Sequence, residues 1–577
     1  MSLLGASVEN SGTIIANAGR IHLGVGERIT LDFDGDGLMR FAVDEALQEQ
    51  IDGLDTAIHN SGELRAEGGQ VVLEGRVARD VFAHVVNNEG VIKAGRIDNS
   101  GGVIRLVGFG GSESSVLNSG TLDAAGRDAS STGGQVHVLG ERVALTGNAL
   151  VDASGAQGGG EVLIGGDYQG KNPDIPNAER VFVGSGVRIK ADAIERGNGG
   201  KVILWADGDT RYFGSISARG GAAGGNGGFA EVSGKQRLAF SGQVDLSAAQ
   251  GQLGSLLLDP DNLYISDTDP AAGQLELVSG PFEANDHIDD YWVNTATLAA
   301  VTGNVTLLAG NDVIFLSDLS MAAQGAADTL TVDAGNAITM NGHGITTDGS
   351  VSMTAGAGGV TGIGTSSVGV DFTINSGGAV SQSGAIETLA LNITAVGGIV
   401  LNAANQVGSF DATNTGAGDI QFTNTATTLT ATISQSGGGD VVIDNTGALE
   451  LGTTTVSDGG DLTLTATGAI SQTGALTIAG TTTLAAGANS ITLDDTGNDF
   501  GGLLTITSGA AVALKDQNAL TVMSTSTTGV AVLTAGGDLA VSGDFDDDLT
   551  TVTTGTGTTD FGATTVGGIL GSQALGR

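Results

Sequence analysis

Cysteine is absent from the 577-residue chain, so no disulfide contributes to its stability. Only 5 prolines occur, which excludes a collagen-like triple helix and a proline-rich linker. Aromatic residues make up 4% of the chain, a content that favours a narrow, repetitive interior over a conventional globular core. No run of 18 apolar residues is present, and the sequence therefore predicts no membrane-spanning helix.

Positive charge is also scarce, because 23 Lys and Arg stand against 64 Asp and Glu, for a net charge of −41. Such a chain repels phosphate groups, so we expect no nucleic-acid partner. Glycine, by contrast, supplies 98 residues, and hydrophobic residues make up 40%, too many for a disordered chain. The abundance of small, β-branched and turn-forming residues predicts short strands joined by tight turns.

Two short units recur in the first half of the chain. One is Asn-x-Gly followed by an apolar residue, with copies at Asn10, Asn60, Asn88 and Asn118 and a variant at Asn99. Asparagine at the same turn of successive units can stack into a ladder of side-chain amides. We therefore expect these turns to lie above one another, with the glycine in the left-handed conformation.

The second unit is Gly-Gly, one residue, and then apolar residues at alternate positions. Its copies begin at Gly68, Gly101, Gly133, Gly159, Gly199 and Gly227. A period of two indicates β-strands, and turns that recur at the same place in each unit are typical of a solenoid. The predicted fold is all-β: a right-handed parallel β-helix with small loop or helix excursions.

The pattern changes along the chain in two places. Val43, Ala46, Leu47 and Ile51 would share one face of a helix, so a short helix is predicted over residues 43–51. After Pro260, Gly-Gly pairs become rare and Thr, Ala and Ser increase. The tetrad Ser-Gln-Ser/Thr-Gly then recurs at Ser381, Ser434 and Ser471, which predicts that the coil continues with a second style of repeat.

Acidic clusters are the first candidate sites. The turn at residues 32–37, Asp-Phe-Asp-Gly-Asp-Gly, resembles the start of a calcium loop, but the position that needs a bidentate Glu holds Val43. We therefore expect a polar turn there, while a calcium site stays an alternative. The remaining clusters are typical of solvated turns: Asp494 with Asp495, and Asp544 with Asp546, Asp547 and Asp548.

The histidines, and a charged cluster that follows one strand, are the other candidates. The histidines at 22, 59, 84, 137, 287 and 343 have no metal-ligand spacing, and His22 and His137 alternate with apolar residues, which predicts outward-facing positions. Asp207, Asp209 and Arg211 could imitate a carbohydrate-active cluster, but a turn after the strand explains them equally well.

The glycine-rich run at residues 220–228 is followed by no Lys-Ser/Thr, which argues against phosphate binding. Whether Trp205, Tyr212 and Phe213 are exposed or fill the coil stays open at this stage. We predict no catalytic, cofactor-binding or metal-binding residues, no cofactor, and no enzyme activity.

An ordered set of stretches within residues 5–260 resembles the passenger proteins of two-partner secretion, the filamentous-haemagglutinin-like adhesins. The set is GASVENSGTIIANAGRIHLGVGERITLDFDGDGL from Gly5, GGGEVLIGGDYQG from Gly158, NGGKVILWADGDT from Asn198, GGNGGFAEVSGK from Gly224 and GSLLLDP from Gly254. The resemblance implies export through an outer-membrane β-barrel translocator and a secreted or cell-surface location. It also implies a fibrous adhesin that attaches to host cells, surfaces or other bacteria.

The same resemblance implies a piece of a longer protein that lacks the signal peptide and the early secretion domain. Residues 1–110 would then be the end of a secretion-type domain, 111–258 Gly-rich rungs, 259–300 an irregular insert or linker, and 301–577 a Thr/Ala/Gly-rich shaft. Two alternatives are a polysaccharide-active β-helix enzyme and the shaft of a contact-dependent toxin carrier. The receptor, glycan or protein, is not specified by the sequence.

Overall fold

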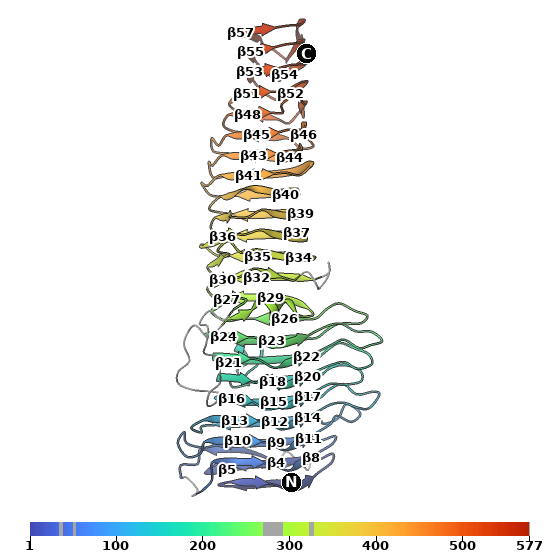
Figure 1. Ribbon diagram of the computed structural model, residues 1–577, viewed down its shortest axis with the longest axis vertical. Helices are drawn as coiled ribbons and strands as arrows, with labels where there is room; N and C mark the ends of the chain where they lie inside the picture. Colours follow the sequence, from blue (N-terminus) through green and yellow to red (C-terminus); the bar gives the residue numbers. More distant parts are fainter. Residues whose placement is uncertain (34–38, 50–52, 269–291, 322–327, 576–577) are drawn as a thin grey trace. The chain divides into compact units, whose positions relative to one another are not determined.

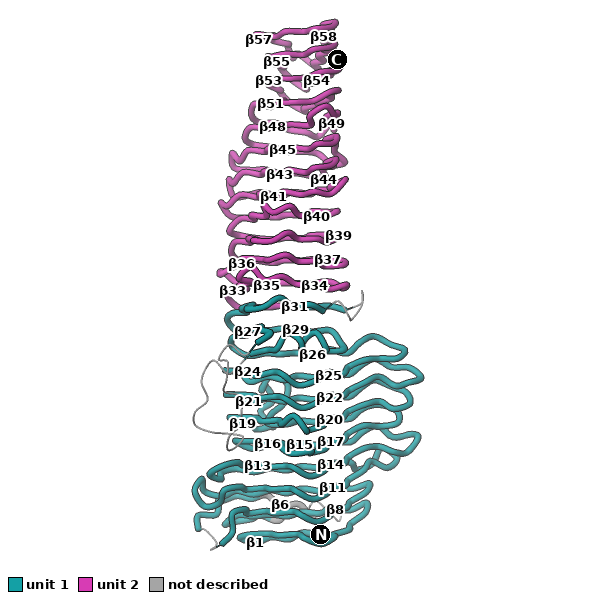
Figure 2. The backbone as a smooth tube through the Cα atoms, viewed as in Figure 1, with its two compact units in different colours: residues 1–324, 328–331 teal, residues 325–327, 332–577 magenta. Residues whose placement is uncertain are grey.

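The structure, a computed structural model, describes residues 1–33, 39–49, 53–268, 292–321 and 328–575. Strands β1 to β58 account for most of this chain, and its described helices are the 3-10 turn η1 (Tyr168–Gly170) and α1 (Thr295–Ala299). The chain divides into two compact units, Met1–Gln324 with Asp328–Thr331, and Gly325–Ala327 with Val332–Arg577 (Figure 2). The all-β prediction is confirmed. No helix in the described ranges is long and apolar enough to cross a membrane.

Most turns of the first unit contribute three strands, and β21 (Lys201–Tyr212) alone spans the first two positions of its turn. One turn holds β9 (Gln70–Arg76), β10 (His84–Asn88) and β11 (Val91–Lys93), and the next holds β12 (Val103–Phe109), β13 (Ser114–Asn118) and β14 (Thr121–Asp123). Each strand pairs in parallel with its counterpart one turn later, as in β9 with β12, β10 with β13 and β11 with β14 (Figure 1). This pairing is that of a parallel β-helix.

The strands thus form three rows in the first unit. The first row is β4 (Arg20–Val25), β9, β12, β15 (Gln135–Gly140), β18 (Glu161–Ile164), β21 (Lys201–Tyr212), β23 (Phe229–Gly234) and β26 (Ser255–Leu258). The second includes β2 (Val8–Asn10), β7 (Thr56–Asn60), β10, β13, β16 (Arg142–Leu145), β19 (Ala178–Val183) and β24 (Arg237–Phe240). The third is an eight-stranded sheet of β3 (Thr13–Ile15), β8 (Glu63–Arg65), β11, β14, β17 (Leu150–Asp152), β20 (Arg188–Lys190), β22 (Ser215–Ser217) and β25 (Gln243–Asp245).

The interior of the first row is a column of aliphatic side chains. Val71, Ile104, Val136, Val162 and Val202 lie in register on successive strands, and all are fully buried. The Gly-Gly units of the sequence coincide with these strands. The period of two therefore placed every second residue of each unit in the core.

The asparagine ladder exists in the second row. The Nδ2 of Asn10 donates to Oδ1 of Asn60, Asn60 donates to Asn88, and Asn88 donates to Asn118, each at 2.7 Å. All four side chains are buried. The variant copy lies elsewhere, because Asn99 accepts a hydrogen bond from the backbone N–H of Thr132 at 3.0 Å.

The glycines of these turns have a different role from the predicted one. The glycines of the four ladder turns, Gly120 among them, are not among the residues with positive φ, so the expectation of a left-handed conformation is wrong there; it holds at Gly101 of the variant copy, where φ is 66°. A Cβ at Gly120 would instead lie 2.0 Å from the carbonyl oxygen of Gly90, and one at Gly90 would lie 2.1 Å from that of Gly62. Glycine is required because the backbones of adjacent turns approach too closely for any side chain.

The predicted helix over residues 43–51 is also wrong. Strand β6 (Met39–Glu45) pairs antiparallel with β5 (Arg28–Phe33), and Leu47 forms a bridge to Val77. Val43 is 2% exposed. Pairing with a neighbouring strand satisfies the backbone and overrides the local helical pattern. Residues 50–52 lie outside the described residues.

Beyond β26, strands β27 (Asn262–Ser266) and β28 (Val293–Asn294) pair with each other, and β28 leads into α1. Within the predicted insert or linker at 259–300, residues 269–291 lie outside the described part of the chain.

The second unit is also built from parallel strands that pair between successive turns, and each turn of its coil contains fewer residues. Strands β41 (Ile420–Asn424), β43 (Val441–Asn445) and β45 (Leu462–Ala466) pair in parallel. The glutamines of two tetrads lie in amide pairs: Gln382 exchanges hydrogen bonds with Asn405 at 2.9 and 3.1 Å, and Gln472 with Asn498 at 2.8 and 2.9 Å. In the third copy, Gln435 donates to the backbone carbonyl of Gly418 at 3.0 Å. The tetrad is thus an internal polar support for the coil.

Candidate ligand-binding groove

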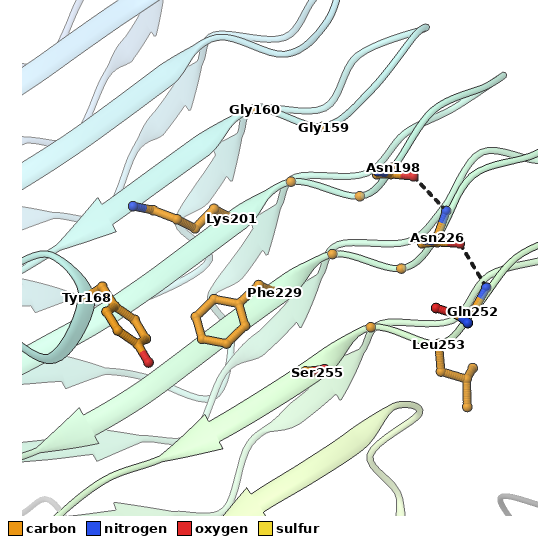
Figure 3. Close-up of a pocket in the computed structure, with 15 residues that line it drawn as sticks. Gly159, Gly160, Tyr168, Asn198, Lys201, Asn226, Phe229, Gln252, Leu253 and Ser255 are labelled. Atoms are coloured by element: carbon orange, nitrogen blue, oxygen red, sulfur yellow. Dashed lines mark hydrogen bonds between the residues drawn. The ribbon is translucent and has the colours of Figure 1, made fainter. Parts of the chain in front are cut away.

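An open groove of about 830 Å³ crosses the first row of strands at the start of β18, β21, β23 and β26. Its floor is formed by the Gly-Gly turns and by side chains of the strands that follow them (Figure 3). The lining residues are Gly159, Gly160, Tyr168, Asn198, Gly199, Gly200, Lys201, Asn226, Gly227, Gly228, Phe229, Gln252, Leu253, Gly254 and Ser255. The groove is therefore lined by residues at the same position, the start of the first-row strand, in several successive turns.

The glycine pairs exist because the coil turns a corner at this point. A Cβ at Gly199 would lie 2.0 Å from the carbonyl oxygen of Ala218, and one at Gly227 would lie 1.9 Å from that of Leu246. The backbone N–H of Gly199 donates to Asn226 at 2.9 Å, and that of Gly227 donates to Gln252 at 2.9 Å. Close packing thus leaves the glycine part of the floor without side chains and with its N–H donors already paired.

A row of carboxamides borders the floor. Asn198 Oδ1 accepts the backbone N–H of Asn226 at 2.8 Å, and Asn226 Oδ1 accepts that of Gln252 at 3.0 Å (Figure 3). All three side chains are exposed. In the part of the chain that the structure describes, the Nδ2 groups of Asn198 and Asn226 have no protein acceptor. Each of these turns therefore presents an available hydrogen-bond donor at the groove.

The opposite side of the groove carries aromatic side chains. Tyr168, from the excursion at residues 165–177 between β18 and β19, faces Phe229 of β23 (Figure 3). Their ring centroids are 5.8 Å apart in an edge-to-face arrangement, and Tyr168 is 46% exposed. An exposed tyrosine beside a half-buried phenylalanine is a surface on which an apolar face of a ligand can rest.

An apolar cluster anchors the excursion to the outer face of the row. Leu163, Ile203 and Trp205 form a buried cluster against which Ile175 and Phe229 pack. These side chains alternate with the interior column, so the outer face of β18 and β21 is apolar only where the excursion covers it.

Two acidic side chains, Glu231 and Asp259, hold the tip of the excursion. The backbone N–H of Gln169, at φ 52°, lies 3.2 and 3.1 Å from the two carboxylate oxygens of Glu231, and its Nε2 donates to Asp259 at 2.6 Å. Glu231 is completely buried, and this burial raises its pKa to about 8. Glu231 is therefore protonated at neutral pH and holds Gln169 without a buried charge.

Lys201 is held at the groove by acidic neighbours. Its Nζ lies 2.8 Å from Asp167 and 3.2 Å from Glu161. Burial opposes ionisation of Asp167, but hydrogen bonds from Asn172 and Lys201 outweigh it and lower the pKa to about 2. Glu161 also lies 3.1 Å from His137 Nε2, and this contact with the imidazole lowers the pKa of Glu161. The Lys201 charge is thus compensated before any ligand arrives.

The charged residues singled out after the strand at 202–205 lie apart from the groove lining. Asp209 is buried and receives two hydrogen bonds from Arg237 at 2.7 and 2.6 Å, with Arg180 at 3.7 Å. Asp207 accepts the indole N–H of Trp205 at 3.0 Å. Both aspartates therefore support the coil, and Arg211 lies in register between Phe182 and Ala239.

The structure also settles where the aromatic residues lie. Trp205 is buried on the outer face beneath the excursion, whereas Tyr212 is buried and stacks on Phe240 at 5.4 Å. The ring of Phe213 lies 6.1 Å from that of Phe182. The sequence could not separate these environments, because strand alternation does not reveal which outer faces a distant loop covers.

The histidines and aspartates weighed as candidates in the sequence are dispersed. His22 and His137 are buried, at 6% and 8% exposure, and burial lowers the pKa of His22 to about 4. In the described ranges, no group of three His, Cys, Asp or Glu is placed to hold a metal ion. Positions 34–37 of the acidic turn and His287 lie outside those ranges. Asp494, Asp544, Asp546 and Asp547 are exposed, while Asp548 accepts the N–H of Ile569 at 2.6 Å.

The groove residues were not identified from the sequence. A usable signal was present, because an amide side chain precedes the glycine pairs at Asn198 and Asn226, and Gln252 stands at the equivalent position before Leu253 and Gly254. The excursion could not be assigned to the groove in this way, since its contacts with Glu231 and Asp259 join residues 62 and 90 positions apart.

The comparison with protein families concerns the second unit. Residues 438–507 are similar to a family described as repeats of unknown function (DUF5649). This stretch contains β43, β45 and the tetrad at Ser471, so the match falls on the regular coil. A comparison with curated proteins gave no match. The chain is thus similar to a repeat family over these 70 of its 577 residues.

Proposed function

We propose that this protein is an extracellular adhesin whose β-helix presents the groove beside Tyr168 as an attachment surface. The observation that carries the proposal is the repetition of an exposed amide on three successive turns along an open groove. Such a surface suits attachment, because successive turns offer equivalent contacts to an extended partner. The resemblance of residues 5–260 to two-partner secretion passengers supports export through an outer-membrane translocator to the cell surface.

Binding accounts for this groove better than catalysis does. None of its lining residues, all within the described ranges, is Asp or Glu, whereas glycoside hydrolysis usually needs a pair of carboxyl groups at the scissile bond. Glu231 has the raised pKa of a general acid, but it is fully buried against Gln169. Its proton therefore stabilises the excursion and does not face a ligand.

Attachment can be tested with beads that carry the full chain. We expect the beads to adhere to bacterial or host-cell surfaces, and the double variant Tyr168→Ala/Phe229→Ala to reduce adhesion severalfold. Tyr264→Ala, which removes an aromatic side chain of similar exposure outside the groove, is the matched control. Beads that adhere to none of these surfaces, or adhesion equal in all three proteins, would contradict the proposal.

Export is a separate part of the proposal. We expect a gene for an outer-membrane translocator beside the gene of this protein. Co-expression of that translocator with the complete gene product should bring the protein to the cell surface, where antibodies detect it. Surface display that is independent of the translocator would refute this route.

A further inference from the structure

We propose that the groove binds a neutral, linear polysaccharide, laid across the turns along the row Asn198, Asn226 and Gln252. This inference rests on the proposed function and names the class of partner. Its basis is the conjunction of a row of amide donors, a backbone floor and an aromatic wall in one groove (Figure 3).

The amide row selects a ligand with repeated acceptors. Asn198 and Asn226 use Oδ1 within the coil, so what they offer to a ligand is the Nδ2 donor. Strands of a sheet are about 4.8 Å apart, and the three side chains therefore span about 10 Å. Sugar hydroxyl and acetamido oxygens, repeated along an extended polymer, are acceptors that such a row can engage together.

The aromatic wall supplies the apolar part of the contact. The faces of sugar rings carry C–H groups with partial positive charge, which pack favourably on the negative face of an aromatic ring. Tyr168 combines this face with a hydroxyl group, and Phe229 lies beside it. The wall and the amide row lie on opposite sides of the glycine floor, which leaves room for a chain of rings between them.

The paired backbone disfavours a peptide. An added peptide strand would need free backbone donors and acceptors at an open sheet edge. Here the N–H of Gly200 donates to Ala191 and that of Gly228 donates to Ala218, both at 2.7 Å. The N–H groups of Gly199 and Gly227 donate to backbone carbonyls of the next turn. A peptide would therefore find only side-chain contacts.

Charge disfavours an acidic polysaccharide. The chain carries a net charge of −41, and the cation of the groove lining, Lys201, is already paired with Glu161 and Asp167. A polyanion would meet overall repulsion without a free cation in the lining. A neutral polymer pays no such electrostatic penalty.

Isothermal titration of the full chain tests the inference. The probes are chitohexaose, cellohexaose and mannohexaose as neutral chains, a heparin hexasaccharide as an anionic chain, and a Ser/Gly-rich peptide of comparable length. We expect at least one neutral hexasaccharide to bind. Tyr168→Ala or Phe229→Ala should weaken that binding roughly 3- to 10-fold. Asn226→Asp keeps the acceptor for Gln252 but removes the NH₂ donor, and should weaken it similarly.

Tyr264→Ala is again the control and should bind as the parent chain does; circular dichroism verifies that every variant is folded. Failure of all neutral probes, binding of heparin or peptide alone, or equal binding by groove variants and control would overturn the inference. The bead assay separates the two proposals. Groove-dependent adhesion without neutral-sugar binding refutes only the ligand class, whereas the absence of adhesion refutes the adhesin function as well.

Discussion

Replacement of Asn88 by alanine is the sharpest test of the buried amide ladder. Asn88 occupies an interior position, where its Oδ1 accepts from Asn60 and its Nδ2 donates to Asn118, both at 2.7 Å. Asn88→Ala removes both bonds and leaves a donor on Asn60 and an acceptor on Asn118 buried without their ladder partners. Each such group costs about 1–3 kcal/mol, so we expect a loss of about 2–6 kcal/mol in local stability.

Asn118→Ala is the matched control, because Asn118 ends the ladder and makes one of these bonds. The expected cost is about half as large, about 1–3 kcal/mol. Asn99→Ala, outside the ladder, should cost less than either.

Hydrogen exchange followed by mass spectrometry suits this comparison, because it reports the local opening free energy of β7, β10 and β13 in the intact chain. A global unfolding curve would mix the two units and is less suitable. If Asn88→Ala opened these strands no more readily than Asn118→Ala, the additive account of the ladder would be refuted.

Three further predictions concern Gly120 of an Asn-x-Gly turn, the contact between Glu231 and Gln169, and the pair of Asp209 with Arg237. Gly120→Ala should destabilise β13 by about 1–3 kcal/mol, the usual cost of an overpacked contact, because its Cβ would lie 2.0 Å from the Gly90 carbonyl oxygen. Unchanged hydrogen exchange in β13 would contradict this close approach. Since burial raises the pKa of Glu231 from 4.5 to about 8, the folded state keeps a proton that the unfolded state loses. Stability of the excursion should therefore fall between about pH 4.5 and 8, by at most about 5 kcal/mol, and Glu231→Gln should abolish the fall in hydrogen exchange at pH 6 and 8. Asp209→Asn removes the charge that accepts two hydrogen bonds from Arg237, whose side chain is 27% exposed, and should cost about 1.5–3 kcal/mol in the local opening of β21 and β24 measured by hydrogen exchange; an effect below about 0.5 kcal/mol would show that these bonds do not stabilise the coil.

The sequence by itself determined the coil. Alternation with a period of two fixes which residues of each Gly-Gly unit enter the core, since successive side chains of a strand point to opposite faces. The recurrence of Asn-x-Gly fixed the ladder, because identical turns stack when every turn of a solenoid adds the same structure. Both conclusions rest on local patterns that repeat, and the repetition supplies the long-range information.

Only the tertiary structure decided the groove and its supports. The excursion at 165–177 has no repeat, and its position depends on a buried Glu231 and an Asp259 that belong to later turns. The segment at residues 39–49 is a second example, because its apolar spacing predicted a helix but strand pairing with β5 determined its structure. In both cases the decisive contacts join non-repeating residues distant in sequence, and neither composition nor periodicity encodes which of them meet.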